Sequence, residues 1–274
     1  MADAQPYAFA FSDAEVRRLM VQGVYWSDIT EAFLRRAGVS AGMRVLDIGS
    51  GVGDVAMIAA RLVGPRGSVV GIDRSAESLA VARQRAAAAG FRSLRFVEAD
   101  FDGFATDERF DVLTGRLVLL HQPDPAAVLR RLAGLLVPGG VVAVQEPDLT
   151  SFAADPATAL SAQVRGWLLD AFGRTGLDLR LGANLPRVFA DAGLPVPHAI
   201  AAQHLTTGPE SPEYEYIALI LRTMLPLIRR FGIATEAEVD VDSFEERLRQ
   251  DSLRHGVIWS SIRMVGAWAR LPAG

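Results

Sequence analysis

The sequence predicts an α/β fold in which helices cover both faces of a mostly parallel sheet. From Met43 to Glu146, short apolar runs alternate with longer segments that have helical spacing, and this alternation is typical of βαβ units. The apolar runs are nearly continuous, as expected for strands that are buried on both sides. With 50% hydrophobic and 22% charged residues, the chain can form a packed core and differs clearly from disordered proteins.

Each expected element of this core has its own signal. The strands are short and apolar, and they cover residues 44–48, 68–72, 94–97, 110–114 and 141–145. The helices between them cover residues 54–62, 76–89 and 125–136. Gly90 closes the second helix and the turn Pro138-Gly139-Gly140 follows the third, because glycine and proline commonly end helices.

The flanking segments are expected to be mostly helical. Two helices are expected between residues 12 and 38, where Ser12 or Asp13 could cap the first. After the fifth strand, the sequence predicts helices at 157–172, 183–192, 212–231 and 242–249, and strands at 198–205 and 257–268. The 274 residues therefore predict one core domain with sizeable insertions rather than two separate domains.

Composition and charge exclude several classes of protein. The net charge of −4 comes from mixed charges with no basic stripe, so we expect no nucleic-acid partner. The longest apolar runs have the length of strands, far below the roughly 20 residues that span a bilayer, and residues 1–11 lack the pattern of a secretory signal. We therefore expect no membrane partner, a cytoplasmic location and a small-molecule substrate.

The chain contains no cysteine and no lysine. Disulfides, cysteine-ligated metal sites and thiol nucleophiles are therefore excluded. A phosphate-binding lysine of the Walker type, a lysine Schiff base and the Tyr-x-x-x-Lys pair of short-chain dehydrogenases are excluded as well.

The strongest chemical signal is a glycine-rich stretch, Asp47-Ile48-Gly49-Ser50-Gly51-Val52-Gly53-Asp54, which joins the first strand to the first helix. Glycine allows positive φ and close approach of a ligand, and the helix N-terminus offers unpaired N–H groups. Asp73 ends the second strand 20 residues after Gly53, where a carboxylate can bind ribose hydroxyls. A tight turn without a ligand, and a carboxylate that caps the helix from Ser75, are the structural alternatives.

The charge of this loop separates two classes of cofactor. The dinucleotide fingerprint G-x-G-x-x-G/A places its third position on Asp54 when counted from Gly49, and on Ala56 when counted from Gly51, so spacing leaves both classes open. A carboxylate at the start of the helix would face a pyrophosphate poorly, whereas S-adenosyl-L-methionine (AdoMet) carries an ammonium and a sulfonium but no phosphate. The acidic residues Asp47 and Asp54 therefore favour AdoMet over NAD or NADP.

Residues 44–148 carry five motifs that resemble those of the class I AdoMet-dependent methyltransferases, in particular the small-molecule, natural-product and ubiquinone-biosynthesis-like enzymes. In chain order they are the glycine motif Asp47–Gly53, Asp73, Glu98-Ala99-Asp100-Phe101, Gly115-Arg116-Leu117-Val118-Leu119-Leu120-His121 and Pro138-Gly139-Gly140. The resemblance implies a Rossmann-like α/β fold with a seven-stranded, mostly parallel sheet. Its last strand, expected within 257–268, would run antiparallel.

The resemblance also implies a division of the chain. Residues 1–40 would form an N-terminal helical cap, and residues 41–148 would form the AdoMet-binding core. Residues 149–274 would complete the sheet. This last part would carry two helical insertions, at about 149–181 and 208–251, that cover the active site as a lid and select the substrate.

Residue by residue, the resemblance assigns the cofactor contacts. The methionine portion of AdoMet would be held by Asp47, Gly49, Ser50, Gly51, Arg116 and Leu117. The glycines would act through their backbone, and Asp47 would bind the ammonium directly or through water. The adenosine portion would contact Asp73, Arg74, Asp100 and Phe101. Asp100 would bind the adenine amine and Phe101 would flank the ring, although the same two residues could belong to an ordinary loop.

Two residues are candidates for acid–base catalysis. His121 follows the fourth strand and could take a proton from an attacking hydroxyl or amine, because the pKa of a free imidazole is near neutrality. It could equally be a loop histidine that bonds the backbone near the turn Pro123-Asp124-Pro125. Glu146 ends the fifth strand and could face the methyl acceptor from the carboxyl edge of the sheet. It could equally anchor the N-terminal helices.

The expected reaction is direct displacement of the methyl group of AdoMet by an O, N or C nucleophile of a small, apolar metabolite. The sequence shows no cluster of histidines and carboxylates for a metal, and it is compatible with a homodimer. Two alternatives stay open, namely a methyltransferase-like protein that binds AdoMet but catalyses a cyclisation or rearrangement, and a non-catalytic AdoMet-binding subunit. Candidates for the acceptor pocket, which could also be plain core, are Tyr7, Tyr25, Trp26, Trp167, Phe172, Tyr214 and Tyr216.

Overall fold

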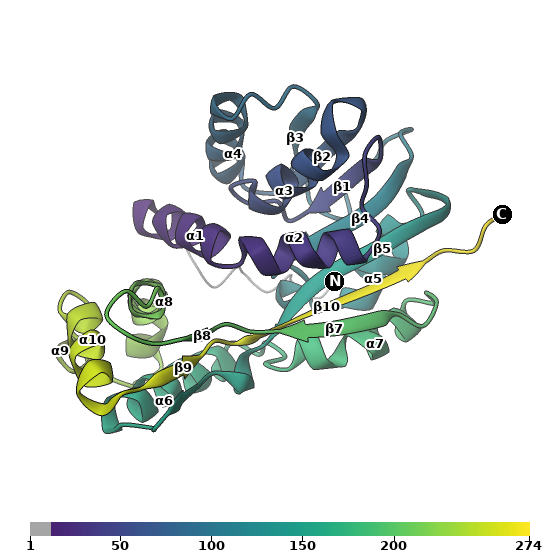
Figure 1. Ribbon diagram of the computed structural model, residues 1–274. Helices are drawn as coiled ribbons and strands as arrows, with labels where there is room; N and C mark the ends of the chain where they lie inside the picture. The colour runs from purple at the N-terminus through teal and green to yellow at the C-terminus, as the bar shows by residue number, and fades with distance from the viewer. Residues whose placement is uncertain (1–11) are drawn as a thin grey trace.

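The computed structural model describes residues 12–274, and its centre is a seven-stranded sheet flanked by helices (Figure 1). The strands are β1 (Arg44–Ile48), β2 (Ser68–Asp73), β3 (Leu94–Glu98), β4 (Phe110–Arg116), β5 (Leu136–Asp148), β7 (His198–Ala202) and β10 (Arg263–Arg270). Their spatial order is β3-β2-β1-β4-β5-β10-β7, and β10 is antiparallel to both of its neighbours while the other pairings are parallel. The predicted sheet, with its antiparallel last strand, is confirmed.

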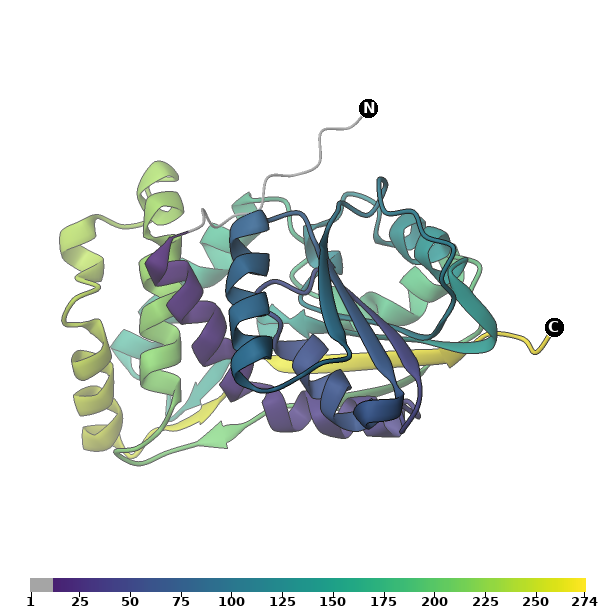
Figure 2. The same cartoon turned by 90° about the horizontal axis from the view of Figure 1, so that it is seen from above.

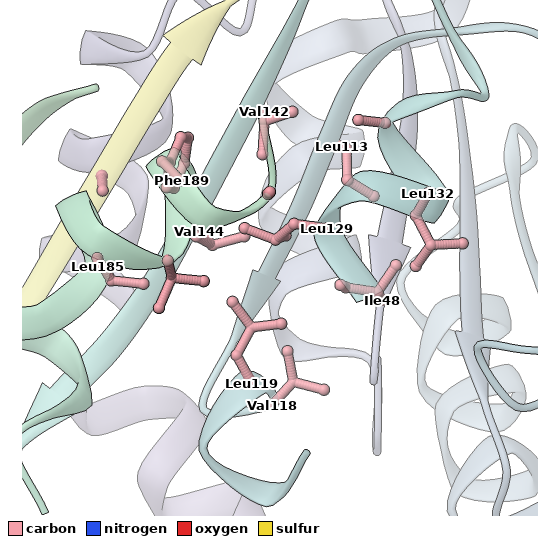
Figure 3. Close-up of a cluster of buried hydrophobic side chains, with 14 of the residues drawn as sticks. Ile48, Leu113, Val118, Leu119, Leu129, Leu132, Val142, Val144, Leu185 and Phe189 are labelled. Atoms are coloured by element: carbon pink, nitrogen blue, oxygen red, sulfur yellow. The ribbon is translucent and has the colours of Figure 1, made fainter. Parts of the chain in front are cut away.

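Helices cover both faces of this sheet. One face carries α2 (Ser27–Arg36), α3 (Asp54–Val63) and α4 (Ala76–Ala88), and the other carries α5 (Pro125–Ala133) and α7 (Leu181–Asp191). Successive strand residues point to opposite faces, so Val45 packs with the first group of helices while Leu46 and Ile48 pack with the second. Figure 3 shows Leu129 of α5 and Phe189 of α7 among the side chains of this second core.

The helix starts follow local capping chemistry. Ser12 caps α1 (Asp13–Tyr25) by accepting the Glu15 N–H at 3.1 Å. Asp124 caps α5 by accepting the Ala127 N–H at 2.8 Å, and Pro125 occupies the first helical position, where a missing N–H does not matter. Such caps satisfy N–H groups that have no partner within the helix.

The remaining elements form a cap beside the sheet (Figure 2). It consists of α1, α6 (Ala159–Arg174), α8 (Glu213–Arg230), α9 (Glu236–Val239), α10 (Phe244–His255), and the strands β6 (Ala153–Asp155), β8 (Leu205–Thr206) and β9 (Ile258–Ser260). Most of these elements share a core of their own, in which the rings of Phe152 and Trp259 stack at 5.4 Å. The division into an N-terminal cap, a core and a remainder at residues 40 and 148 stays a prediction.

Two expected strands are each broken in the structure. The run predicted at 198–205 forms β7 and β8, and the run predicted at 257–268 forms β9 and β10. The last residues of the first run (β8) and the first residues of the second run (β9) leave the large sheet. They pair in a second, three-stranded sheet of order β6-β9-β8. The breaks lie opposite each other, because the Ser261 N–H donates to the carbonyl of His204 at 3.0 Å and the His204 N–H donates to Oγ of Ser261 at 2.9 Å.

The helix predicted at 125–136 is also shorter than expected, because α5 ends at Ala133. The turn Pro138-Gly139-Gly140, expected before the fifth strand, lies inside β5 instead. There the Gly139 N–H donates to the carbonyl of Pro272 at 3.0 Å. Pairing with the C-terminal segment thus keeps Pro138-Gly139-Gly140 in the strand, although the local sequence favours a turn.

Candidate active site

The loop between β1 and α3 has a shape that its glycines permit. Gly49, Gly51 and Gly53 have φ values of 61, 49 and 89°, which side chains with a Cβ rarely adopt. A Cβ at Gly49 would lie 2.2 Å from Cγ2 of Val118, so the loop also approaches the segment after β4 too closely for a side chain. This place, at the carboxyl edge where the strand order reverses between β1 and β4, is where open α/β sheets bind ligands.

Asp73 ends β2 beside this loop. Its Oδ2 accepts the Gly51 N–H at 2.8 Å, and its Oδ1 accepts the Ser75 N–H at 2.9 Å. Ser75 itself caps α4 by accepting the Ser78 N–H at 3.1 Å. Because each carboxylate oxygen has a second lone pair and Asp73 lines the cavity described below, the side chain can brace the loop and bind ligand hydroxyls at the same time.

Asp47 is buried beneath the glycine loop and does not belong to the cavity wall. Neither of its carboxylate oxygens has a hydrogen-bond partner among the described residues. Burial raises the pKa of this carboxyl well above its usual value, the charge of Arg116 opposes the shift, and Asp73 adds to it. A buried carboxylate without a partner is unfavourable, so a cation or a bridging water above the loop would stabilise it.

Asp54 begins α3, and its Oδ1 lies 2.7 Å from Nη2 of Arg85. It lines the cavity, so a carboxylate stands at the helix N-terminus where a dinucleotide would need its pyrophosphate. Helix α1 crosses directly over this residue, since a Cβ on Gly23 would lie 2.3 Å from Cγ of Asp54. The N-terminal helix therefore closes the cavity above the glycine loop.

Asp100 and Phe101 follow β3 and line the cavity. Oδ1 of Asp100 accepts the Gly103 N–H, which leaves Oδ2 available to a ligand. Phe101 packs at the edge of the core shared with α5 and α7, and its Cζ lies 3.9 Å from the position that a Cβ of Gly49 would occupy. A polar edge and an apolar face thus stand together near the glycine loop.

Arg116 and Leu117 end β4 in the wall of the cavity. Arg116 is buried, and its Nη1 donates to Oγ1 of Thr30 in α2 at 2.9 Å. Burial lowers the pKa of its guanidinium, while the charges of Asp54 and Asp47 oppose this shift. Leu117 has φ of 58°, a left-handed conformation that is unfavourable for a non-glycine residue and often marks a functional site.

His121 ends the 3-10 turn η2 (Leu119–His121) and lines the cavity. Burial, helped by the charges of Arg18 and Arg74, lowers the pKa of His121 to about 4. The imidazole is therefore neutral at neutral pH, and the imidazolium that would form on accepting a proton is unfavourable. Arg74 is exposed at the rim of the same cavity.

Glu146 is fully buried in β5 and does not belong to the cavity wall. Its Oε1 accepts the N–H groups of Val118 at 3.0 Å and Leu119 at 2.7 Å. Burial raises the pKa of this carboxyl to about 8, and the N–H groups oppose the shift. Glu146 thus anchors the turn that follows Leu117, rather than the N-terminal helices that the sequence suggested as its structural alternative.

A cavity of about 1060 Å³ brings these residues together. Its wall contains every predicted site residue except Asp47 and Glu146, namely Gly49, Ser50, Gly51, Asp73, Arg74, Asp100, Phe101, Arg116, Leu117 and His121. Other parts of the wall are apolar and come from the cap and the segment that leads to it, with Leu149, Phe152, Leu168, Leu169, Phe172, Ile217, Ile220 and Ile262.

Sequence reasoning missed four polar residues that the cap adds to the wall, Glu15, Arg18, Gln22 and Glu213. Arg18 pairs with both carboxylate oxygens of Glu15 at 2.7 Å and donates to Oε1 of Gln22 at 2.8 Å. The Tyr216 O–H also donates to Oε1 of Gln22, at 3.2 Å. The spacing of Glu15, Arg18 and Gln22 places them on one helix face, which was the available signal, whereas nothing in the sequence marks Glu213.

The aromatic residues proposed for the acceptor pocket divide into two groups. Phe172 and Tyr216 line the cavity. The side chains of Tyr25, Trp26, Trp167 and Tyr214 are buried in the cores of the cap and do not line it. Tyr7 lies outside the described residues.

Residues 12–274 contain neither a metal-binding cluster nor a membrane-spanning helix. No group of three or more histidine, aspartate or glutamate side chains in this part of the chain is arranged to hold a metal ion. Within the same residues, no helix has both the length and the apolar character needed to cross a membrane.

The sheet order, the glycine loop, the carboxylate at the end of β2 and the cavity above them define the architecture of a class I AdoMet-dependent methyltransferase. Residues 39–192 match the model of a family described as a methyltransferase domain, and the chain belongs to this family.

Relatives of known sequence and structure agree with this assignment. Methyltransferase GfsG of Streptomyces halstedii is 30% identical over 223 residues, which are 79% of this chain and 74% of that protein. An uncharacterised 37.1 kDa protein from a transposon of Streptomyces fradiae is 33% identical over 181 residues, which are 64% of this chain but only 49% of that protein. A phosphoethanolamine N-methyltransferase of Haemonchus contortus, solved with S-adenosylhomocysteine, shares the fold with a TM-score of 0.57 at 18% identity, over 96% of this chain and 61% of that one.

Proposed function

We propose that this chain binds AdoMet in the cavity and transfers its methyl group to an O, N or C nucleophile of a small, largely apolar metabolite. The observation that carries the proposal is the composition of the cavity wall, in which the glycine loop and Asp73 meet apolar side chains of the cap such as Phe172 and Ile220. A cofactor with polar groups and an apolar acceptor can thus share one enclosed space.

The residues present fit AdoMet. Asp73 would bind the ribose hydroxyls, Asp100 the adenine amine, and Phe101 would flank the ring. The carboxyl of Asp47, which has no partner beneath the glycine loop, would be satisfied by the ammonium, directly or through water. When bound, AdoMet supplies an electrophilic methyl group on a sulfonium; the chain contributes binding, alignment and exclusion of water.

Several observations support methyl transfer over the alternatives. The glycine loop and Asp73 are intact, which argues against a subunit that has lost its cofactor site. A relative that shares most of this chain's length is named a methyltransferase. The wall of the cavity mixes arginines with a larger number of carboxylates and with apolar groups, so a small molecule suits it better than a nucleic acid. The two candidates for acid–base catalysis differ in their access to the acceptor: His121 lines the cavity, whereas Glu146 lies behind its wall and holds the turn after β4.

Calorimetric titration of the purified protein tests the cofactor, and mass spectrometry of candidate acceptors tests the reaction. We expect AdoMet and S-adenosylhomocysteine to bind and NADP not to bind, because Asp54 occupies the place of a pyrophosphate. The product should be heavier than the acceptor by one methyl group. Binding of NADP without AdoMet would contradict the proposal, and a product of unchanged mass would indicate the cyclisation or rearrangement.

A further inference from the structure

Glu213 is a buried carboxylate in the wall of the cavity, at the first position of α8. It is only 2% exposed. Its Oε2 accepts the O–H of Tyr25 in α1, while its Oε1 has no hydrogen-bond partner among the described residues. A carboxylate that is held by one oxygen and unpartnered at the other, beside apolar Ile217 and Ile220, is arranged to bind a polar group on an otherwise apolar molecule.

We propose that Glu213 is the catalytic residue that binds the hydroxyl of the methyl acceptor and takes its proton. This inference rests on the proposed function, and it names both the residue and the chemical class of the acceptor, an apolar molecule with a weakly acidic hydroxyl such as a phenol.

Helix α1 connects Glu213 with the cofactor part of the cavity. Gly23 of α1 is pressed against Asp54 at the glycine loop, and Tyr25 holds Glu213. Gly23 and Tyr25 are two positions apart in α1, which is about 3 Å along the helix axis. Residues two positions apart do not share a helix face, so α1 lies between the start of α3 on one side and the carboxylate of α8 on the other. Glu213 and the glycine loop both line the cavity beside this helix.

The charges around Glu213 favour a hydroxyl over an ammonium. Tyr216 lies one helical turn further along α8. Burial raises its pKa, and the positive charges of Arg18 in α1 and Arg116 in β4 oppose this shift. Arg18 is paired with Glu15. Arg116 makes its hydrogen bond to a neutral threonine, with the carboxylates of Asp54 and Asp47 close enough to act on its charge. A buried positive charge stabilises a developing oxyanion and repels a cationic amine.

Glu213 also has a suitable basicity. Burial raises the pKa of its carboxyl to about 7, and the hydrogen bond from Tyr25 opposes the shift. When the pKa of a base is near the working pH, a large share of the base is deprotonated and it still binds a proton strongly enough to drive the transfer. The other titratable or charged groups near it are Tyr25 with the neighbouring ring of His204, Tyr216, Arg18 and Arg116.

The proposed step balances in atoms and charge. The acceptor oxygen attacks the methyl carbon of the sulfonium donor and forms the new carbon–oxygen bond. The carbon–sulfur bond breaks and its electron pair stays on sulfur, which gives a neutral thioether. The hydroxyl proton passes to Oε1 of Glu213, which becomes a neutral carboxylic acid and later returns the proton to water.

A binding experiment tests this inference without depending on turnover. The probe is α-naphthol, a phenol with an apolar body, titrated calorimetrically into the full chain loaded with S-adenosylhomocysteine. Glu213→Gln should weaken naphthol binding roughly tenfold, the scale of a hydrogen bond to a charged group. Glu215→Gln is the matched control, because Glu215 lies on the same first turn but is paired with Arg17 at the surface, and it should bind like the wild type.

The pH dependence supplies a second readout. Wild-type affinity for α-naphthol should rise with pH through about 7, as Glu213 deprotonates, and the Glu213→Gln variant should show no such rise. In Tyr25→Phe the rise should move to higher pH, because the lost hydrogen bond had lowered the pKa of Glu213. Affinity for S-adenosylhomocysteine should stay within about twofold in all variants.

The outcomes separate the two proposals. A wild-type protein that binds neither AdoMet nor S-adenosylhomocysteine would defeat the proposed function itself. A protein that binds S-adenosylhomocysteine, but binds no naphthol or binds it equally well with Glu213→Gln, would overturn the role of Glu213 and leave the cofactor assignment intact. Tighter binding of α-naphthylamine than of α-naphthol to the wild type would overturn the hydroxyl class.

Discussion

Three buried carboxyl groups near the cavity have raised pKa values, and their surroundings separate their roles. Asp47 and Glu146 lie behind the wall, whereas Glu213 is part of it. Glu146 accepts hydrogen bonds from the backbone of the turn after β4. At the scale of single residues, a shifted pKa therefore identifies a buried carboxyl, and only its access to the cavity indicates chemistry.

The first prediction concerns Asp73. Asp73→Ala should lower the affinity for S-adenosylhomocysteine by about tenfold or more, because two hydroxyl hydrogen bonds to a charged acceptor are lost. Calorimetry measures the affinity, and thermal unfolding checks the loop, which Asp73 also braces through Gly51 and Ser75. A variant that binds the ligand as tightly as the wild type would reduce Asp73 to this bracing role.

The second prediction compares two candidate bases. If Glu213 takes the proton, kcat for α-naphthol should rise with pH through about 7, and Glu213→Gln should lower kcat by about 10²-fold. If His121 takes the proton, kcat should be flat over this range, because an imidazole with a pKa of about 4 is already deprotonated. We expect the rising profile, and a flat wild-type profile with a large loss in His121→Ala would favour His121.

The third prediction concerns stability and Glu146. Because its folded pKa of about 8 lies above the usual 4.5, folding favours the protonated carboxyl, and stability falls as the pH rises from about 4.5 to about 8. Glu146→Gln removes this fall and keeps an acceptor for Val118 and Leu119. The melting temperature of the variant minus that of the wild type should therefore increase by several degrees as the pH rises across this window, since 1 kcal/mol shifts the melting temperature by about 2–4 °C. Parallel curves would contradict the assignment.

The sequence located most of the site at this scale, because glycines and acids at strand ends converge on one edge of a parallel sheet. The sequence could not show which of these side chains reach the cavity and which are buried behind its wall. Asp47 and Glu146 each end or nearly end a strand, as Asp73 does, yet both point behind the wall. Glu213 was missed because it comes from a helix that joins the cavity through tertiary packing alone.

At the scale of elements, α1 is the piece that joins the two halves of the site. It touches α3 through Gly23 and α8 through Tyr25 and Gln22. The core strands and helices were predictable because their hydrophobic periods are regular. The breaks at His204 and Ser261 were not, because the chain stays extended there and only its pairing partners change.

The fourth prediction tests the close contact of α1. Gly23→Ala would place a Cβ 2.3 Å from Cγ of Asp54, so α1 or Asp54 must move. We expect a loss of about 1–3 kcal/mol in stability, the scale of overpacking, together with weaker binding of S-adenosylhomocysteine. Gly166→Ala is the control, since it lies within α6 with no atom within 4 Å of its Cβ and should be neutral or stabilising by up to about 1 kcal/mol. Equal behaviour of the two variants would contradict the contact.

The fifth prediction concerns the covering segments. If residues 12–30 and 208–251 act as a lid, their amide hydrogens should exchange more slowly when S-adenosylhomocysteine and α-naphthol are bound together. The strands β1 and β4, which lie in the sheet, serve as the internal reference. Unchanged exchange in both segments would show that the cavity is closed without a moving lid.

At the scale of the whole molecule, the two halves of the cavity have different origins. The family match covers residues 39–192, which include the sheet from β1 to β5 and α6 but exclude α1 and α8. The part of the wall proposed for AdoMet therefore lies within the residues that match the family. The part that carries Glu213 belongs to the segments outside the match, as expected where acceptors differ.

The paired breaks at His204 and Ser261 have a mechanical consequence. Two neighbouring antiparallel stretches, β7–β8 and β9–β10, run from the large sheet into the small one (Figure 1), so a two-stranded ribbon joins the cap to the core. A ribbon bends easily out of its plane and resists shear within it. If the cap moves, we therefore expect it to tilt toward or away from the glycine loop, while its register along the strands stays fixed. Each closure would then return Glu213 to the same position opposite the cofactor.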